Sequence, residues 1–218
     1  ATIEFWIKPK SLSYWNQTGG PGWGTFMFHA DGSGAFTAGW DTSNRTNTDN
    51  WSLSVGSWTH VAIVVERNKM SIYLNGKRRA SCSSGNYSGV GGFGDLVFAS
   101  SGNGAQDAVY DEIRIWKTAR TEAQVKAYMN SELSGNLIPK DLVAYFKGDL
   151  TEDASGNKVL CDCVGGYHAT LQDYYSVSSS EVPSLSGTTE SPTLSINEPT
   201  GSVYAGVPVT LNATYNTA

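Results

Sequence analysis

Two short runs of alternating hydrophobic and polar residues predict a three-stranded antiparallel unit in the first half of the chain. The apolar side chains of each run share one face: Val61, Ile63 and Val65 in the first, and Met70, Ile72 and Leu74 in the second. A period of two residues is typical of a β-strand, whereas the apolar positions of a helix recur at three and four. Residues 67–69 form a polar connection. Asn75-Gly76 supplies the positive φ pair of a type I′ turn, so a third strand is expected from Lys77 to Ser81.

The same pattern predicts further short strands along the chain. The expected strands are Thr2–Ile7, a hairpin of Gly24–His29 and Ala35–Trp40, Trp51–Val55, Asp95–Ala99, Val109–Trp116 and Leu142–Phe146. Alternation in the 109–116 strand predicts that Tyr110 shares a face with Glu112 and Arg114. One helix is expected, because Thr121 as N-cap and Gln124 three residues later form a capping box. This helix should end within residues 129–132.

Two motifs in this order resemble a known family. The first motif comprises Trp58, the run His60-Val61-Ala62 and the run Tyr73-Leu74-Asn75-Gly76; the second is residues 110–116, YDEIRIW, followed by residues 119–121, ART. Together they resemble the laminin G-like and pentraxin-like jelly rolls of the concanavalin A-like lectin/glucanase superfamily. The resemblance implies an all-β fold, a two-sheet antiparallel jelly-roll sandwich with one short helix. Such domains usually have a strand before the one at residues 2–7, so another segment is expected to fill that place.

The composition shifts along the chain and predicts three regions. Residues 1–175 are expected to form the laminin G-like jelly roll, and residues 176–193 are rich in Ser, Thr, Pro and Gly, as in a linker. Residues 194–218 resemble the first strands of an immunoglobulin-like or PKD-like β module. The chain begins inside a strand, so we expect a mature or excised piece accompanied by other domains of the same polypeptide.

Charge and composition narrow the classes of partner. The formal net charge of −5 argues against nucleic acid. No apolar run approaches the roughly 20 residues of a membrane-spanning helix. The 24 glycines and 11% aromatic residues are typical of a sandwich, often one that is secreted or on the cell surface. Cys82, Cys161 and Cys163 predict either one disulfide and one thiol or three thiols; zinc is disfavoured because four ligands at zinc spacing are missing.

Aromatic residues in glycine-rich loops are the candidate ligand-binding residues. Tyr14, Trp15 and Trp23 lie within residues 11–24, where they either cover the edge of the core or form a stacking platform for a sugar. Trp40 and Tyr87 lie in other loops that a jelly roll can bring near Trp23. We expect at least one of Trp15 and Trp23 to be exposed.

Calcium is the cofactor that the resemblance suggests, because lectin-like domains often hold Ca²⁺ at the sandwich rim. Ca²⁺ takes six to eight oxygen ligands, and the candidate ligands are Asp31, Asp41, Asp107 and Asp111. None of them lies in a linear calcium motif. The alternative interpretation is that each is a solvated aspartate in a turn.

Catalysis is not expected. The laminarinase-type members of the superfamily carry a Glu-x-Asp-x-Glu pattern that this chain lacks, and the adjacent Asp111 and Glu112 should point to opposite faces of a strand. His60 is expected to be a packed core residue. The predicted function is therefore a non-catalytic module that binds a carbohydrate or another extracellular ligand, such as a protein. The alternatives are a structural spacer or adhesion domain, and an accessory domain of a glycoside-degrading enzyme.

Overall fold

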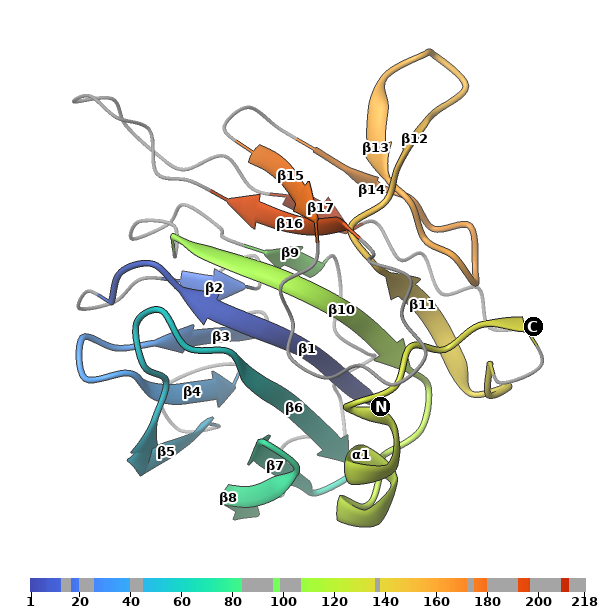
Figure 1. The fold of residues 1–218 in the computed structure, drawn as a ribbon. Helices are drawn as coiled ribbons and strands as arrows, with labels where there is room; N and C mark the ends of the chain where they lie inside the picture. Colours follow the sequence, from blue (N-terminus) through green and yellow to red (C-terminus); the bar gives the residue numbers. More distant parts are fainter. Residues whose placement is uncertain are drawn as a thin grey trace.

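The computed structural model describes residues 1–12, 17–19, 26–39, 45–83, 96–98, 107–135, 138–171, 175–179, 192–196 and 209–211. For residues 17–19, 175–179, 192–196 and 209–211 the description covers the backbone alone. Within these ranges the chain forms two antiparallel β-sheets and one α-helix, α1 (Glu122–Tyr128). Figure 1 shows the sheets stacked one behind the other. The predicted all-β sandwich with one short helix is confirmed.

The first sheet, called sheet A, has the strand order β15-β16-β10-β1-β6-β7-β8, with β11 also paired to β10. Its strands are β1 (Thr2–Pro9), β6 (Thr59–Glu66), β7 (Lys69–Leu74), β8 (Lys77–Ser83), β10 (Ala108–Trp116), β11 (Leu142–Phe146), β15 (Tyr175–Ser179) and β16 (Pro192–Ile196). The second, sheet B, has the order β12-β13-β14-β17-β9-β2-β3-β4-β5. Its strands are β2 (Gln17–Gly19), β3 (Met27–Ala30), β4 (Ala35–Gly39), β5 (Arg45–Ser52), β9 (Leu96–Phe98), β12 (Leu150–Glu152), β13 (Lys158–Leu160), β14 (Ala169–Thr170) and β17 (Val209–Leu211).

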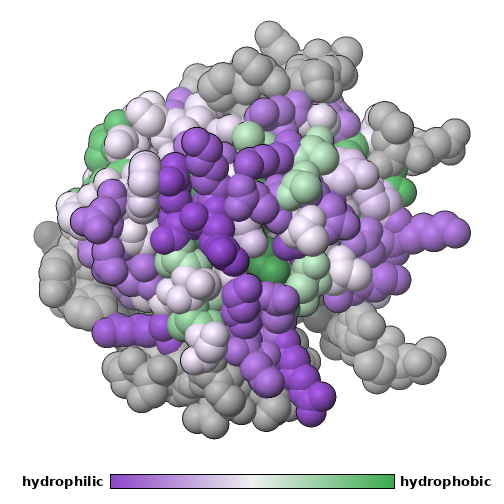
Figure 2. All heavy atoms as spheres, turned by 90° about the horizontal axis from the view of Figure 1, so that it is seen from below, coloured by the Kyte–Doolittle hydropathy of each residue, from purple (hydrophilic) through white to green (hydrophobic). Residues whose placement is uncertain are grey.

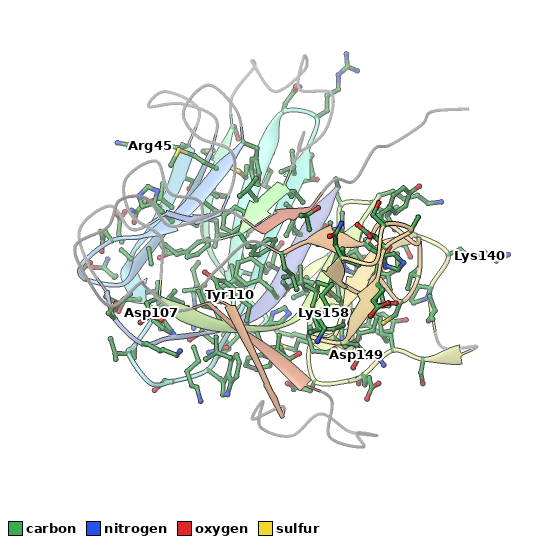
Figure 3. All side chains as sticks on the ribbon, turned by 90° about the horizontal axis from the view of Figure 1, so that it is seen from above. Arg45, Asp107, Tyr110, Lys140, Asp149 and Lys158 are labelled. Atoms are coloured by element: carbon green, nitrogen blue, oxygen red, sulfur yellow. The ribbon has the colours of Figure 1, made fainter. Side chains whose placement is uncertain are left out.

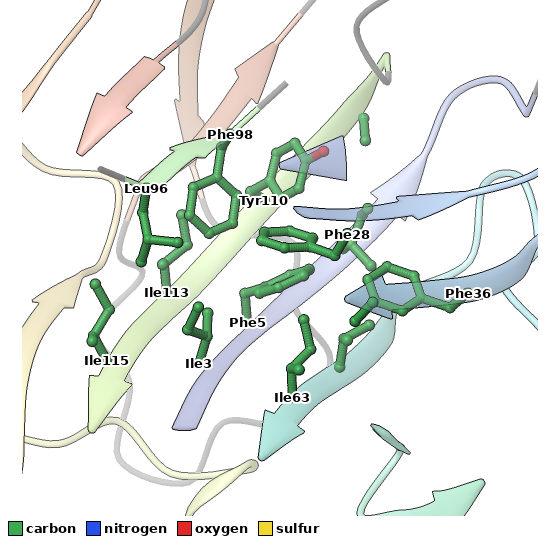
Figure 4. Close-up of a cluster of buried hydrophobic side chains, with 14 of the residues drawn as sticks. Ile3, Phe5, Phe28, Phe36, Ile63, Leu96, Phe98, Tyr110, Ile113 and Ile115 are labelled. Carbon is green, nitrogen blue, oxygen red and sulfur yellow. The ribbon is translucent and has the colours of Figure 1, made fainter. Parts of the chain in front are cut away.

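The core lies between the two sheets and is built around aromatic rings. Phe5 of β1 lies 5.5 Å from Phe28 and 5.4 Å from Phe98, measured between ring centroids. Figure 4 shows these rings between the strands, with isoleucines of sheet A beside them. Phe5 and Phe28 are fully buried, and each buried aromatic side chain removes about 150–250 Å² from water. This burial is the main force that holds the sheets together.

The central hairpin follows the predicted pattern. Strands β6, β7 and β8 pair in sequence, and Asn75 and Gly76 both have positive φ, at 49° and 72°. The predicted core residues Val61, Ile63, Met70, Ile72 and Leu74 are buried in the main core, and the partly buried Val65 packs against it. The face assignment for these strands is confirmed.

Helix α1 covers part of the outer face of sheet A. Its capping box is present: the Thr121 side chain accepts a hydrogen bond from the backbone N–H of Gln124, and the Gln124 side chain accepts one from Thr121 N–H. Val125 is fully buried and packs against Ala62, Val64 and Tyr73 of the hairpin. The capped helix therefore belongs to the structural frame, as the sequence predicted.

Buried charges lie beside the helix on the same outer face. Arg114 donates hydrogen bonds to the Glu112 carboxylate and, at 2.7 Å, to the backbone oxygen of Tyr128 at the end of α1. Its Nη1 atom lies 3.6 Å from Glu4, which accepts a hydrogen bond from Trp116 at 3.0 Å. Burial raises the pKa of both Glu4 and Glu112, and the Arg114 guanidinium opposes this shift. Arg114 thus joins sheet A to the C-terminal end of the helix.

A bulge in β10 contradicts the predicted alternation of that strand. The pairing of β1 with β10 shifts register between Glu4 and Trp6, and Glu112 has a φ of 54°. An inserted residue reverses the faces beyond it. Tyr110 consequently lies in the core with Ile113, so the prediction that Tyr110 shares a face with Glu112 was wrong.

The far edge of β10 is occupied by two segments from later in the chain. β11 pairs along residues 113–116 of β10, and β16 pairs along residues 108–110. Whether they take the place of the strand that usually precedes residues 2–7 stays a prediction. An unpaired edge exposes a row of backbone donors and acceptors, so any available strand gains by adding to it.

The C-terminal strands pair with the sandwich. β15 pairs with β16, and β17 pairs with both β9 and β14. Of residues 194–218, expected to begin an immunoglobulin-like or PKD-like module, the structure describes residues 194–196 and 209–211, and the module stays a prediction. Two strands alone cannot bury a core, which favours their addition to existing sheets. The boundaries after residues 175 and 193 stay predictions.

Candidate ligand-binding site

The aromatic residues predicted to bind a ligand all lie outside the described residues. They are Tyr14, Trp15, Trp23, Trp40 and Tyr87, and the calcium candidate Asp41 also lies outside. Their roles stay predictions, as does the exposure of Trp15 or Trp23.

Several strands of sheet B end or begin next to the parts of the chain that carry these candidates, and these strand ends lie side by side at one end of the sheet. The register places Met27 of β3, Gly39 of β4 and Arg45 of β5 side by side. β9 is antiparallel to β2, and its last residue, Phe98, pairs with Gly19, the last residue of β2. The first residue of β9 therefore lies beyond Gly19, at the same end of the sheet as Met27. Figure 3 shows Arg45 pointing outward from this edge. The strand ends that border residues 20–25 and 40–44, and the start of β9 after residue 95, therefore lie together.

The three described calcium candidates lie in different settings. The Asp31 carboxylate accepts hydrogen bonds from the backbone N–H groups of Ser33, at 2.8 Å, and Ala35, at 3.1 Å, within the β3–β4 turn. Asp107 lies 3.7 Å from the Lys10 ammonium, at the start of β10 (Figure 3), and Asp111 is buried. Across the described ranges, no three His, Cys, Asp or Glu side chains gather in a group that could hold a metal ion. Calcium binding stays a prediction.

The cysteines and His60 can be placed directly. Cys82, Cys161 and Cys163 are in the thiol form, as in one of the two predicted alternatives, and burial raises the pKa of the Cys163 thiol to about 11. His60 is buried in sheet A with its Nε2 atom 3.9 Å from Glu4. Burial, aided by the Arg114 charge, lowers the pKa of His60 to about 3. His60 is thus a buried, packed residue, as the sequence predicted, and the low pKa keeps it neutral.

Trp51 is an exposed tryptophan on β5, the last strand of sheet B. Ala35 pairs with Ser52 and Thr37 pairs with Asn47, so β5 bulges outward between these two positions. Thr48 holds the bulge, because its hydroxyl accepts a hydrogen bond from Phe36 N–H and donates one to the backbone oxygen of Trp51. Trp51 is 49% exposed, although an indole ring normally stabilises a fold by burial.

A second bulge brings Arg79 onto this tryptophan. Ile72 pairs with Ala80 and Tyr73 with Arg78, which makes Arg79 the inserted residue of β8. Its guanidinium carbon lies 3.3 Å from the centre of the Trp51 ring. β5 and β8 are the last strands of their sheets and contact each other, as Figure 1 shows. The Trp51–Arg79 pair therefore bridges the edges of the two sheets.

The residues next to Trp51 in the sequence are polar and exposed. Asp49, Asn50 and Ser52 belong to the same strand and are exposed. Arg79 covers one face of the indole, so the exposed part of the ring remains for a ligand. An apolar surface with a few directed polar groups is the usual composition of a small-molecule site. The sequence pattern predicts that Trp51 begins a strand, whereas it lies near the end of β5. Its place within the polar run TNTDNWS, residues 46–52, was the available signal of exposure.

The remaining surface shows no extended apolar area on the face seen in Figure 2. This face, viewed from the side of α1 and β8, is covered mostly by hydrophilic residues. The described part of the chain contains no helix long and apolar enough to span a membrane.

Similarity to solved structures agrees with the sandwich. A candidate carbohydrate-binding protein from Bacteroides ovatus has a TM-score of 0.59 and 20% identity, over 97% of this chain and 54% of its own. This chain thus spans about half the length of that protein. Domain 4 of an extracellular arabinanase from Geobacillus stearothermophilus, solved with arabinotriose, has a TM-score of 0.47 and 22% identity, over 58% of this chain and 64% of its own. A heptameric pentraxin from Limulus polyphemus has a TM-score of 0.45 and 17% identity, over 57% of this chain and 67% of its own.

Sequence comparison identifies the family. A comparison with curated proteins found no match. A family model described as the concanavalin A-like lectin/glucanases superfamily matches residues 1–126, which is more than half of the chain. These residues contain the central hairpin, the first part of the capped helix and both strands of the Trp51–Arg79 pair. The chain belongs to the concanavalin A-like lectin/glucanases superfamily.

Proposed function

We propose that this chain is a non-catalytic carbohydrate-binding module of a secreted or cell-surface protein, and that its ligand stacks on Trp51. The observation that carries the proposal is the exposed indole in the irregular part of β5, stacked against Arg79 and next in sequence to the exposed Asn50 and Ser52. The C–H face of a sugar ring can lie on such an indole while polar neighbours bind its hydroxyl groups. Family membership supports the proposal, because the superfamily includes lectins.

The non-catalytic part of the proposal rests on the setting of the carboxylates. Glu4 and Glu112 are almost fully buried under α1 and interact with Arg114. A retaining glycosidase needs two carboxyl groups about 5–5.5 Å apart that both reach the substrate. Glu4 and Glu112 do not face solvent, so they do not offer such a pair.

A purely structural role for the Trp51–Arg79 pair is the main competing explanation. A cation–π contact at an exposed site contributes about 0.5–1 kcal/mol, a small part of the stability of a domain. Burying the indole would contribute more than this contact, yet the bulge keeps the ring half exposed. Under the structural explanation, loss of the ring should cost a little stability and leave binding unchanged, whereas under the proposal it should weaken binding strongly.

The test is a glycan array probed with the parent protein and with Trp51→Ala. We expect the parent to bind at least one glycan and the variant to bind it about 30-fold more weakly, as for a central tryptophan in an interface. The matched control is Val55→Ala, which removes another exposed apolar side chain close in sequence. Near-ultraviolet circular dichroism checks that both variants are folded. The proposal is wrong if no glycan binds, or if Trp51→Ala binds as tightly as the parent.

A further inference from the structure

We propose that the Trp51–Arg79 pair selects an acidic saccharide, a sugar that carries a carboxylate or sulfate group. This inference rests on the proposed function and adds the chemical class of the ligand. Its central observation is that the two bulges join an exposed ring to a guanidinium that has no anionic partner among the described residues.

The hydrogen-bonding groups of Arg79 are unused within the described part of the chain. A guanidinium has five N–H donors, and the contact seen for Arg79 is the one with the face of Trp51. Its Nε atom is buried without a hydrogen-bond partner. By contrast, the more buried Arg114 and Arg120 both pair with carboxylates. Arg79 therefore retains donors that a ligand can use.

The stacking geometry orients these donors. A separation of 3.3 Å between the guanidinium carbon and the ring centre requires the two flat groups to lie face to face. The N–H groups of a stacked guanidinium point outward in its own plane, where they can bind both oxygens of a carboxylate or sulfate. An acidic sugar could then place its ring on the exposed part of Trp51 and its anionic group at the edge of Arg79.

The local charge differs in sign from that of the whole protein. Lys77, Arg78 and Arg79 are consecutive on β8, whereas the chain carries a formal net charge of −5. Glu122, the acidic residue near Arg78, already accepts a hydrogen bond from Lys126 at 2.6 Å. The acidic residue on the Trp51 bulge is Asp49, which is exposed. The basic strand beside an exposed ring favours an anion over a neutral ligand.

The two bulges together indicate that the Trp51–Arg79 contact is a specific feature of the fold. Arg79 is the inserted residue of β8, and Trp51 lies in the irregular part of β5, so two separate departures from regular pairing produce one contact. Bulges re-aim side chains and occur often beside functional sites. A regular strand at either position would send the side chain in a different direction.

The test compares acidic oligosaccharides with matched neutral forms. The probes are oligogalacturonate, hyaluronan oligosaccharides and a sulfated chondroitin oligosaccharide, with carboxyl-reduced or desulfated counterparts, measured by isothermal titration calorimetry. We expect at least one acidic probe to bind about tenfold or more tightly than its neutral counterpart, since a hydrogen bond to a charged group contributes more than a neutral one. Separate carboxylate and sulfate arms show which anionic group is recognised.

The variants assign this preference to Arg79. Arg79→Gln should remove the preference for the acidic form but keep the weaker binding of the neutral form. Arg79→Lys should keep only part of the preference, because the lysine ammonium cannot bind two oxygens in one plane as the guanidinium does. The control Arg67→Gln removes an equal charge from an exposed turn and should bind like the parent. Equal affinity for acidic and neutral forms, or an acidic preference that persists in Arg79→Gln, overturns the inference alone. If no probe binds and the glycan array is also negative, the proposed function fails with it.

Discussion

At the scale of single residues, Arg114 connects several groups on the outer face of sheet A. It lies between two carboxylates, those of Glu4 and Glu112, and it also donates to the end of α1. All three side chains are almost completely buried. Loss of one member of such a group leaves buried charge without compensation, which costs more than the pair contributes when intact.

Replacing Arg114 should therefore destabilise the fold strongly. We expect Arg114→Met to lower the free energy of unfolding at neutral pH by about 3–5 kcal/mol, measured by urea unfolding. Arg67→Met, at an exposed turn, is the control and should stay within about 0.5 kcal/mol of the parent. A loss below about 1 kcal/mol for Arg114→Met would show that the two carboxylates do not depend on the guanidinium.

His60 makes the stability dependent on pH. Its pKa is lowered to about 3 in the folded chain, from an ordinary value of 6.5, so the folded state keeps it neutral. The contribution of His60 to the free energy of unfolding is fully present above about pH 6.5. It is lost as the pH falls toward about 3, because over this range the unfolded chain binds the proton and the folded chain does not. The raised pKa values of Glu4 and Glu112 act in the opposite direction.

Comparison with His60→Gln isolates this effect. Between about pH 6 and pH 4 we expect the parent to lose up to about 1.4 kcal/mol per pH unit more than the variant. The carboxylates are common to both proteins and contribute to both profiles. Chemical unfolding across this range measures the difference, and parallel profiles would show that His60 takes up its proton normally in the folded state.

Among the elements, β5 depends on the turn between β3 and β4. Leu53, which follows β5 and is buried, donates its backbone N–H to the backbone oxygen of Gly34 at 2.8 Å. Gly34 has a φ of 82°, and a Cβ atom there would lie 2.2 Å from the backbone oxygen of Leu53. The close approach of this turn fixes the end of β5 next to Trp51.

The turn can be tested with two glycine substitutions that share one backbone conformation. Gly56 has a φ of 74° but open space around the position of a Cβ atom. We expect Gly56→Ala to cost about 1–2 kcal/mol for the left-handed conformation alone. Gly34→Ala should cost clearly more, because the backbone of Leu53 must also move. Equal melting temperatures for the two variants would contradict the close approach.

At the scale of the whole molecule, local patterns predicted much of the fold, whereas the predicted ligand-binding residues lie outside the described part of the chain. The central hairpin, the capping box and the core faces of β6 and β7 follow from period, turn chemistry and a short motif, all of which are local. The face of Tyr110 could not be predicted, because an inserted residue in β10 leaves no distinct mark in the sequence. The Trp51–Arg79 contact joins edges of two sheets, so it depends on two bulges and on the stacking of the sheets.

The residues predicted to bind a ligand lie outside the described part of the chain, so their position relative to Trp51 stays a prediction. Trp51 itself lies beside Ser52, which pairs with Ala35 at the start of β4. The location of binding therefore decides between the predicted residues and the proposed site.

Amide chemical shift mapping by nuclear magnetic resonance tests the central claim most directly. The strongest glycan from the array is titrated into isotope-labelled protein, and the backbone amides and indole N–H signals are followed. We predict that the largest shifts fall on residues 49–52, on residues 78–80 and on the Trp51 indole. Shifts that cluster instead around Met27, Gly39 and Arg45, and leave the Trp51 indole unchanged, would contradict the account.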